Sequence, residues 1–302
     1  MTTDILVQRP AAAPPASAPQ PRRRRSAREV AGSIVKHAAL SLLALTMIYP
    51  LIWLVVSSFK PTDSIFRNMS IIPSEVTLHN YTNGWHAFGY PESTFLWNSL
   101  IIAVGAIIGN LLSCSLTAYA FARIRFRGRG LMFATMLLTL MLPFQVTVVP
   151  QYIIFKQLGW INTFLPMIVP KFLATDAFFV FLMVQFIRGL PRELDEAARI
   201  DGAGHFRTFF RIILPLMTPA LATTAIFTFI WTWNDFFTQL LYLTQLKNKT
   251  ASVALNLFLD SSSQSDYGGM FAMSMVSLAP LFFVFLFGQR WLLRGIATTG
   301  IK

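Results

Sequence analysis

Six long apolar runs, separated by shorter polar segments, dominate the pattern of the chain. A membrane-spanning helix needs about 20 predominantly apolar residues to cross the ~30 Å hydrocarbon layer of a bilayer. Runs of this length lie at about residues 38–59, 96–121, 131–149, 166–187, 215–239 and 270–292. The fifth run is the least uniform, because it contains Asn234 and Asp235. The pattern predicts an all-α membrane protein with six transmembrane helices, and an even number places both termini on the same side.

The composition agrees with this assignment. Hydrophobic residues make up 54% of the chain and charged residues only 13%, whereas soluble domains carry about 25% charged residues. The chain therefore has too little charged surface for a soluble domain of its length.

The distribution of positive charge predicts the orientation, because Lys and Arg are enriched in cytoplasmic loops. With the N-terminus inside, nineteen of the 25 Lys and Arg residues fall on the cytoplasmic side and five in external loops, with Lys171 inside a span. Both termini are therefore predicted to be cytoplasmic. The net charge of +12 is explained by membrane topology, and no nucleic-acid partner is needed.

Residues 1–36 differ from the rest, since they are rich in Pro, Ala and Ser and end with the basic residues Arg22 to Arg25, Arg28 and Lys36. Such a segment cannot bury enough apolar area to offset its ordering entropy, so a disordered basic cytoplasmic tail is predicted. A signal peptide is the alternative. It is disfavoured because the following apolar run continues to about Phe59 and no small-residue cleavage site follows.

Several spans carry residues that interrupt or tighten helix packing. Small residues at four-residue spacing in the second span, Gly105, Gly109 and Ser113, predict close approach of a neighbouring helix. Pro143 and Pro150 predict a kinked or unwound outer end of the third span. Pro166 and Pro170 act similarly in the fourth span, which also contains Lys171 and Asp176. On a continuous helix these two charges point in different directions, so we expect no ion pair between them.

The most polar segment in the body of the chain runs from Arg188 to Pro215. Pro191 and the acidic residues after it favour the start of a helix. The glycines at 202 and 204 then end it. A second short helix is predicted from about His205 to Ile213. The segment predicts a helix-turn-helix between the fourth and fifth spans, although a solvated interhelical loop is the simpler interpretation.

The fifth span combines aromatic rings with amide and carboxylate groups. Phe227, Trp231 and Asn234 share one helical face, and Trp233 lies on an adjoining face with Asp235 following. Such a combination suits a hydroxylated ligand, because the aromatic rings can stack on the C–H faces of the ligand and the amide and carboxylate groups can bond its hydroxyls. These five residues are therefore candidates for a substrate path. An interfacial aromatic belt with polar contacts between helices is the alternative.

The spacing within residues 196–215 resembles the signature cytoplasmic loop of bacterial ABC importer permeases: Glu-Ala-Ala, three residues, Gly, nine residues and Ile-x-Leu-Pro. The resemblance extends over about residues 38–302 to the carbohydrate-uptake class, of the maltose and glycerol-phosphate types. The matching segments are YPLIWLVVSSFK (49–60), FLWNSLIIA (95–103), LTAYAFARIRFRGR (116–129), LPFQVTVVPQYIIF (142–155) and WNDF (233–236).

The resemblance implies a subunit that forms half of a translocation pore in the bacterial inner membrane. Its implied partners are a second homologous permease, two ATPase subunits and an extracytoplasmic solute-binding protein. The 188–215 loop is implied to couple the chain to the ATPase. The residues that match the coupling motif are Glu196, Ala197, Ala198 and Gly202, with Asp201 and Arg199 as helpers. Glu196 is the candidate for a charge pair with the ATPase, and Gly202 for the turn.

Enzyme functions are disfavoured. The chain lacks G-x-x-x-x-G-K-[ST], so ATP and Mg²⁺ are expected on the partner subunits, with no cofactor on this chain. No His-Glu-x-x-His motif or cysteine cluster predicts a metal, and the single cysteine, Cys114, is expected to fill the core. An autonomous secondary transporter is an alternative, disfavoured because no convincing inverted repeat is found. A neutral di- or oligosaccharide is the favoured substrate, and glycerol-3-phosphate or a related phosphoester is the alternative.

Overall fold

The computed structural model describes residues 27–259 and 265–297, and the described residues contain helices and no strands. Four helical stretches are long and apolar enough to cross a membrane: Ala31–Ser58, Glu92–Arg123, Leu165–Gly189 and Tyr267–Trp291. Two further pairs qualify if each bent pair counts as one span, Arg129–Thr139 with Phe144–Gln157 and His205–Leu216 with Thr218–Asn234. The chain is thus a multi-pass helical membrane protein with four to six candidate spans.

Helix α1 (Ala27–Ser58) begins before the predicted boundary of the tail at residue 36, and the first 26 residues of that tail lie outside the described residues. The chain divides into two compact units, residues 1–51 and residues 52–302. Residues 31–51 of the first unit contain no buried side chain. The candidate sites described below all belong to the second unit.

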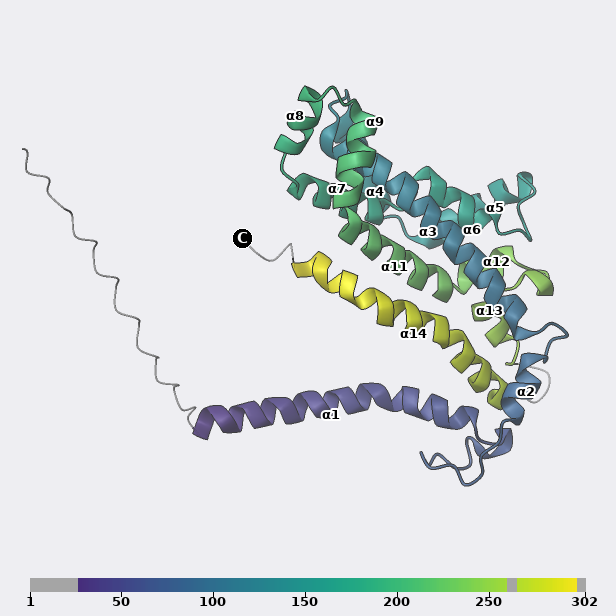
Figure 1. Cartoon of the computed structure of the whole chain (residues 1–302). Helices are drawn as coiled ribbons and strands as arrows, with labels where there is room; N and C mark the ends of the chain where they lie inside the picture. Colours follow the sequence, from purple (N-terminus) through teal and green to yellow (C-terminus); the bar gives the residue numbers. More distant parts are fainter. Residues whose placement is uncertain (1–26, 260–264, 298–302) are drawn as a thin grey trace, which may run out of the picture. The chain divides into compact units, whose positions relative to one another are not determined.

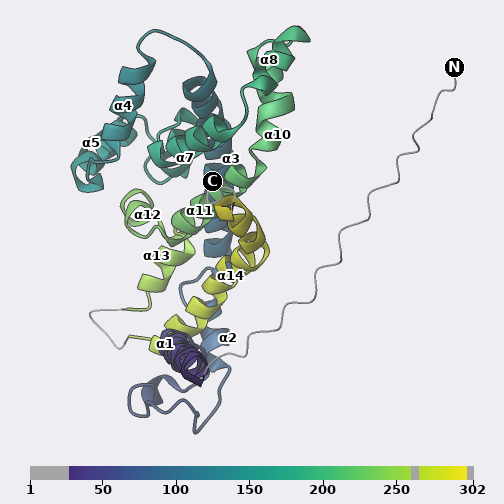
Figure 2. The ribbon, with the colours of Figure 1, turned by 90° about the vertical axis from the view of Figure 1, so that its left-hand side faces the viewer.

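Helix α3 (Glu92–Arg123) is the central element of the second unit, where α7 (Ala177–Gly189) and α11 (Thr218–Asn234) pack along it (Figures 1 and 2). The glycines of α3 leave room for the segment that precedes α7 to pack closely against this helix. A Cβ added to Gly105 would lie 2.9 Å from Cδ1 of Ile168, and one added to Gly109 would lie 2.9 Å from Cβ of Lys171. The predicted close approach at these glycines is confirmed.

The third and fourth predicted spans are broken. Helix α4 (Arg129–Thr139) and helix α5 (Phe144–Gln157) meet at 100° around Pro143, which confirms the predicted kink toward the C-terminal end of the third span. In the fourth span, α6 (Leu165–Ile168) continues as the 3-10 helix η2 (Val169–Leu173). The helical backbone is then interrupted at Ala174, which has a left-handed φ of 55°, before α7 begins. Such irregular backbone is tolerated at membrane depth where protein surrounds it.

The fifth span is also interrupted. The chain passes through α9 (His205–Thr208), a π-helical turn η3 (Phe209–Ile213) and α10 (Leu214–Leu216), then bends by 74° into α11. Helix α11 ends at Asn234, and a separate helix, α12 (Phe237–Tyr242), follows it. The prediction of one continuous span over residues 215–239 is therefore wrong at the C-terminal end of that range. Asp235 separates the two helices because its backbone is extended, with ψ of 106°.

Short helices that hydropathy did not predict join the spans. Helix α2 (His79–Trp85) packs against α14 (Tyr267–Ala297), and α13 (Ala251–Asn256) packs against both α3 and α14. Residues 188–215, which we call the coupling segment after the role that the resemblance implies, contain α8 (Glu193–Ile200), followed by α9. The remaining short elements are η1 (Thr62–Ser64) and η4 (Leu246–Asn248). The largest buried apolar cluster joins α3, α7 and the η3 segment, and includes Cys114, whose predicted place in the core is confirmed.

Candidate functional site

The predicted helix-turn-helix between the fourth and fifth spans is confirmed by α8 and α9. Acidic residues Glu193, Asp195 and Glu196 occupy the first turn of α8, where the helix dipole favours negative charge. The helix ends at a glycine turn: Gly202 has φ of 73°, and its N–H donates to the carbonyl of Arg199 at 3.0 Å. The N–H of Ala203 donates to the carbonyl of Ala198 at 2.8 Å, which completes a Schellman-type cap.

The five predicted coupling residues lie together on this motif and differ in exposure. Ala198 is buried at 3% exposure, so its small side chain packs inward. Glu196, Ala197, Asp201 and Gly202 are exposed. The structure thus presents four of the five on an open surface, while the role that the resemblance implies for them stays a prediction.

Large apolar side chains are exposed on both sides of the glycine turn, which the sequence reasoning missed. Ile200 is 88% exposed, Phe206 76% and Phe210 51%. Their apolar character inside the most polar segment of the chain was the available signal. Exposed apolar groups with a polar rim mark interaction surfaces, so we call Ile200, Phe206 and Phe210 the exposed apolar group.

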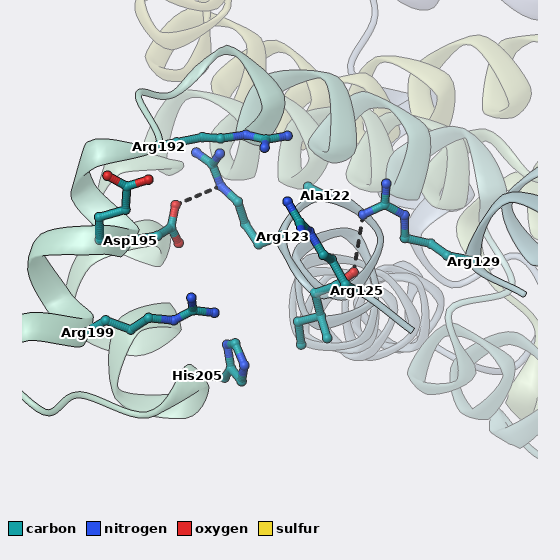
Figure 3. A pocket seen from close by; sticks show the side chains of 10 residues that line it. Ala122, Arg123, Arg125, Arg129, Arg192, Asp195, Arg199 and His205 are labelled. Atoms are coloured by element: carbon teal, nitrogen blue, oxygen red, sulfur yellow. Dashed lines mark hydrogen bonds and ion pairs between the residues drawn. The ribbon is translucent and has the colours of Figure 1, made fainter. Parts of the chain in front are cut away.

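Arg123, the last residue of α3, fastens the coupling segment to the membrane helices (Figure 3). Its Nε lies 3.2 Å from Oδ2 of Asp195, and the Arg123 side chain is only 6% exposed. Its Nη2 also donates to the carbonyl oxygen of Leu190 at 2.8 Å and to that of Pro191 at 3.5 Å. One guanidinium therefore holds both α8 and the turn that precedes it.

A cavity of about 460 Å³ lies between α8 and the turn that joins α3 to α4 (Figure 3). Charged side chains dominate its lining. The lining residues are Ala122, Arg123, Ile124, Arg125, Arg129, Arg192, Asp195, Glu196, Arg199 and His205. We call this cavity the arginine pocket.

The predicted substrate-path residues separate into two environments. Trp231 is 49% exposed, and its ring lies 5.8 Å from that of Phe227, 5.5 Å from that of Phe178 and 5.1 Å from that of Phe179, between ring centroids. Trp233 is instead buried at 4% exposure, where it stacks on Phe229 and donates from Nε1 to the carbonyl of Ser277 at 3.0 Å. Phe227 and Trp231 thus form an accessible aromatic surface, and Trp233 joins α11 to α14.

The two polar candidates follow at the end of α11. Asn234 is exposed and donates from Nδ2 to the carbonyl of Ile230 at 2.8 Å. Asp235 accepts at Oδ1 from the N–H of Thr238 at 3.1 Å and so caps α12. Trp233 and Asn234 line a cavity of about 230 Å³, whose other lining residues are three serines and three leucines: Ser252, Ser274, Ser277, Leu255, Leu278 and Leu281.

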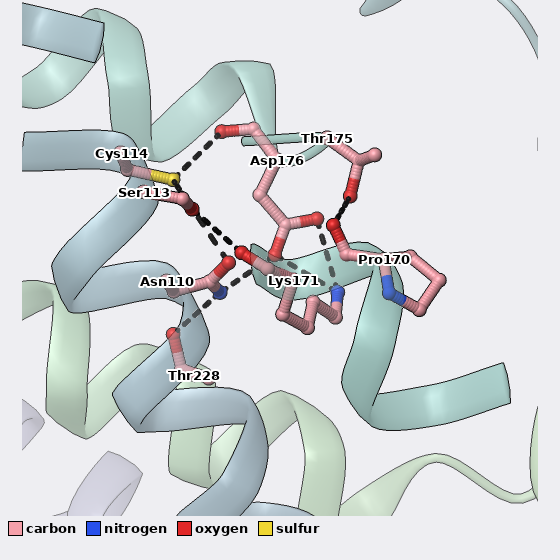
Figure 4. A network of polar contacts seen from close by, with 8 residues as sticks. All are labelled: Asn110, Ser113, Cys114, Pro170, Lys171, Thr175, Asp176 and Thr228. Atoms are coloured by element: carbon pink, nitrogen blue, oxygen red, sulfur yellow. Dashed lines mark hydrogen bonds and ion pairs between the residues drawn. The ribbon is translucent and has the colours of Figure 1, made fainter. Parts of the chain in front are cut away.

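A polar network joins α3, η2, α7 and α11 (Figure 4). Lys171 Nζ lies 3.0 Å and 2.9 Å from the two carboxylate oxygens of Asp176. Asn110 Nδ2 donates to Asp176 Oδ2 at 2.7 Å and to Thr228 Oγ1 at 3.1 Å. Ser113 Oγ donates to the carbonyl of Lys171 at 2.6 Å. The expectation that Lys171 and Asp176 form no ion pair is wrong, because the chain between them is not one continuous helix but is interrupted at Ala174.

Metal binding finds no support in residues 27–259 and 265–297. In these ranges no group of three or more His, Cys, Asp or Glu side chains could hold a metal ion. The lone Cys114 is buried and its Sγ lies 3.9 Å from the Oγ of Ser113.

Comparison with known proteins places the chain in a family. Residues 109–298 match the model of the family described as binding-protein-dependent transport system inner membrane component. The arabinooligosaccharides transport system permease protein AraQ of Halalkalibacterium halodurans is 33% identical, over 86% of this chain and 93% of that protein. The trehalose/maltose transport system permease protein MalG of Thermococcus litoralis is 33% identical, over 86% and 94%. The sn-glycerol-3-phosphate transport system permease protein UgpE of Yersinia enterocolitica is 32% identical, over 86% and 94%.

The fold has a solved counterpart. A bacterial ABC transporter involved in the import of the acidic polysaccharide alginate matches with a TM-score of 0.79 at 21% identity, over 90% of this chain and 100% of the other. At 21% sequence identity, this structural similarity supports the assignment of the fold alone. Together with the family match over most of the chain, these findings confirm the resemblance predicted from the coupling-loop spacing: the chain belongs to the family of binding-protein-dependent transport system inner membrane components, the permease subunits of ABC importers.

Proposed function

We propose that this chain forms half of the translocation pathway of an ATP-driven sugar importer in the bacterial inner membrane, with both termini cytoplasmic. A second homologous permease subunit supplies the other half. Two ATPase subunits bind ATP and Mg²⁺ on the cytoplasmic side, and an extracytoplasmic solute-binding protein delivers the substrate. This chain itself binds no cofactor in the proposal.

The exposed apolar group on the coupling segment is the observation that carries the proposal. Ile200 and Phe206 flank the Gly202 turn and are 88% and 76% exposed. Burying such side chains in a groove of a partner contributes roughly 1.5–3 kcal/mol each. The exposed carboxylate of Glu196 stands on the same motif and is available for an ion pair with a basic residue of the ATPase.

The coupling mechanism follows from how the motif is fastened. Closure of the ATPase pair on ATP moves the groove that holds α8. Because Arg123 ties α8 and Leu190 to the end of α3, this displacement reaches the central helix of the span bundle. The pathway then switches between inward-facing and outward-facing states.

A neutral di- or oligosaccharide is the proposed substrate. The accessible rings of Phe227 and Trp231 suit the C–H faces of a sugar, and Asn234 with neighbouring serine hydroxyls suits its hydroxyl groups. Lys171 is engaged by Asp176, so this cation is not free to neutralise a phosphoester.

Glycerol-3-phosphate or a related phosphoester is the alternative substrate, since UgpE is among the relatives. An autonomous secondary transporter is the alternative from another class. The two classes differ in a simple property: a permease half transports nothing by itself, whereas a secondary transporter works in liposomes without ATP.

The experiment is affinity purification from membranes through this chain, followed by reconstitution of what copurifies. Recovery of a second permease and an ATPase, with uptake that requires ATP and a binding protein, supports the proposal. The binding protein is then screened against oligosaccharides and glycerol-3-phosphate to identify the substrate. Recovery of the chain alone, with ATP-independent transport in liposomes, would overturn the proposal.

A pair of glycine variants tests the coupling segment. Alanine at Gly202 must adopt φ of 73°, at a cost of about 1–2 kcal/mol for an L-residue, and proline cannot adopt it and lacks the N–H that bonds Arg199. Gly202→Ala should weaken coupling of ATP hydrolysis to uptake, and Gly202→Pro should abolish it, with membrane insertion intact. Gly204→Ala is the matched control, because φ there is −75° and an added Cβ meets nothing within 4 Å. Equal uptake by all three variants would count against the docking role.

A further inference from the structure

The arginine pocket collects positive charge from two separate elements. Arg123, Arg125 and Arg129 come from the end of α3 and the start of α4, and Arg192 and Arg199 come from the coupling segment. Figure 3 shows Arg192 and Arg199 extending from the coupling segment toward the turn that carries Arg123 and Arg125. A smaller cavity of about 170 Å³ adjoins it and shares Arg123, Asp195, Arg199 and His205.

The positive charge of this pocket is only partly balanced within the chain. Asp195 pairs with Arg123, and Arg129 donates from Nη1 to the carbonyl of Ile124 at 3.3 Å. In the part of the chain that the structure describes, the side chains of Arg125, Arg192 and Arg199 form no ion pair and donate no hydrogen bond to protein. Glu196 is the one remaining carboxylate in the lining. Guanidinium groups that outnumber the carboxylates around them repel each other, and an anion between them relieves the repulsion.

We infer that the arginine pocket binds the phosphate of an anionic phospholipid headgroup. The planar guanidinium matches phosphate oxygens with paired N–H donors, and three free guanidiniums can surround one phosphate. A cavity of about 460 Å³ has room for a phosphoglycerol headgroup rather than for the phosphate alone.

Its position favours a lipid over a soluble phosphate. The pocket lies where α3 ends and α4 begins, which are the ends of two candidate membrane segments. Basic clusters directly next to spans attract anionic headgroups on the cytoplasmic face. Exposed apolar side chains follow the arginines in sequence, with Phe126 37%, Leu131 75% and Met132 55% exposed, and these suit acyl chains.

The pocket shares Glu196 and Arg199 with the motif proposed to couple to the ATPase. The exposed apolar group contributes none of its lining, which is mostly guanidinium, carboxylate and imidazole. A lipid phosphate held there bridges the α3–α4 turn and α8, so it adds to the restraint that Arg123 already places on the coupling segment. The inference requires the turn to lie at the membrane surface and does not depend on what the transporter carries.

The test is native mass spectrometry of the assembled transporter, delipidated and then titrated with phosphatidylglycerol or phosphatidylcholine. A triple variant, Arg125→Gln with Arg192→Gln and Arg199→Gln, removes the free guanidiniums. The matched control removes the same charge from exposed arginines outside the lining, Arg127, Arg207 and Arg211. At about 1 kcal/mol per arginine near a membrane surface, the triple variant should bind phosphatidylglycerol on the order of 100-fold more weakly, with the control unchanged.

A second measurement uses the unaltered chain, so that it stands if the triple variant fails to fold. A photoreactive phosphatidylglycerol should crosslink to peptides containing residues 122–129 and 192–199, and excess inorganic phosphate should not displace it. Equal loss of lipid in the triple variant and its control would overturn the inference, as would displacement by phosphate or crosslinking elsewhere. Displacement of the lipid when the ATPase binds would also overturn it, by assigning the pocket to the ATPase interface.

Discussion

Lys171 and Asp176 form an ion pair across the break in the fourth predicted span, with Nζ 2.9 Å from Oδ2. The two side chains are 29% and 25% exposed, so the pair is mostly removed from solvent. Asn110 on α3 bonds the same carboxylate and also Thr228 on α11. The pair therefore holds the interrupted segment at Ala174 against the central helices.

The first prediction concerns this ion pair. Lys171→Met or Asp176→Asn leaves one charge without its partner, which should destabilise the protein by about 1–3 kcal/mol, less than for a fully buried pair. The double variant should recover part of this loss, because no charge is left unpaired. The measurement is the thermal unfolding midpoint in detergent. Lys156→Met is the control, since Lys156 is exposed and forms no ion pair in the described residues; a loss equal to that of Lys171→Met would contradict the prediction.

Arg123 and Asp195 give the second prediction. Arg123→Gln and Asp195→Asn should each destabilise the coupling segment, and together they should cost less than the sum, with a coupling free energy of about 1–3 kcal/mol. Arg123→Lys should keep the ion pair but lose the bonds to Leu190 and Pro191, because a lysine lacks the planar fork. In the Arg123→Lys variant, the rate of substrate uptake should therefore fall by a larger factor than the rate of ATP hydrolysis.

The control is a second double-mutant cycle with the same residue types. Arg127 and Asp201 are exposed and share no ion pair in the described structure. Their glutamine and asparagine variants should be additive in the unfolding midpoint. Additivity in the Arg123 cycle as well would show that the contact contributes nothing measurable.

The length of the apolar runs and the spacing of the motif predicted most of the helices that position the candidate site. Runs of about 20 residues identify α3 and α14 because these helices are continuous. The acidic first turn and Gly202 predict α8 and its end because capping is a local property. These features need no knowledge of distant residues.

The parts that could not be predicted depend on tertiary contacts or on broken backbone. The Lys171–Asp176 pair requires the helix break at Ala174, and an alanine gives no sequence signal for a left-handed φ. The contact of Arg123 with Leu190 joins residues far apart in sequence. Periodicity places Trp231 and Trp233 on adjoining faces, yet the packing of α3 and α14 against α11 decides which of them is buried.

The third prediction concerns the close contact at Gly109. An added Cβ would lie 2.9 Å from Cδ2 of Phe172 and 3.0 Å from the carbonyl carbon of Lys171, so Gly109→Ala must displace backbone. Overpacking of this kind costs about 1–3 kcal/mol, more than the roughly 1 kcal/mol gained by alanine in a helix. Gly130→Ala in α4 is the matched control, because nothing lies within 4 Å. Gly109→Ala should lower the unfolding midpoint and uptake, and Gly130→Ala should leave both equal or higher; the same result at both sites would rule out close packing at Gly109.

The fourth prediction separates the two tryptophans of α11. Trp233 is buried, stacks on Phe229 and bonds the carbonyl of Ser277, so Trp233→Ala should cost about 3–5 kcal/mol and reduce the amount of folded protein. Trp231 is half exposed beside Phe227, so Trp231→Ala should leave assembly with the partner subunits intact and raise the half-saturating substrate concentration for uptake. Size-exclusion profiles of the purified complex and uptake kinetics in the same membranes distinguish the two effects. Unchanged kinetics for a well-assembled Trp231→Ala complex would remove the aromatic surface from the substrate path and leave it as a packing contact with Phe178 and Phe179.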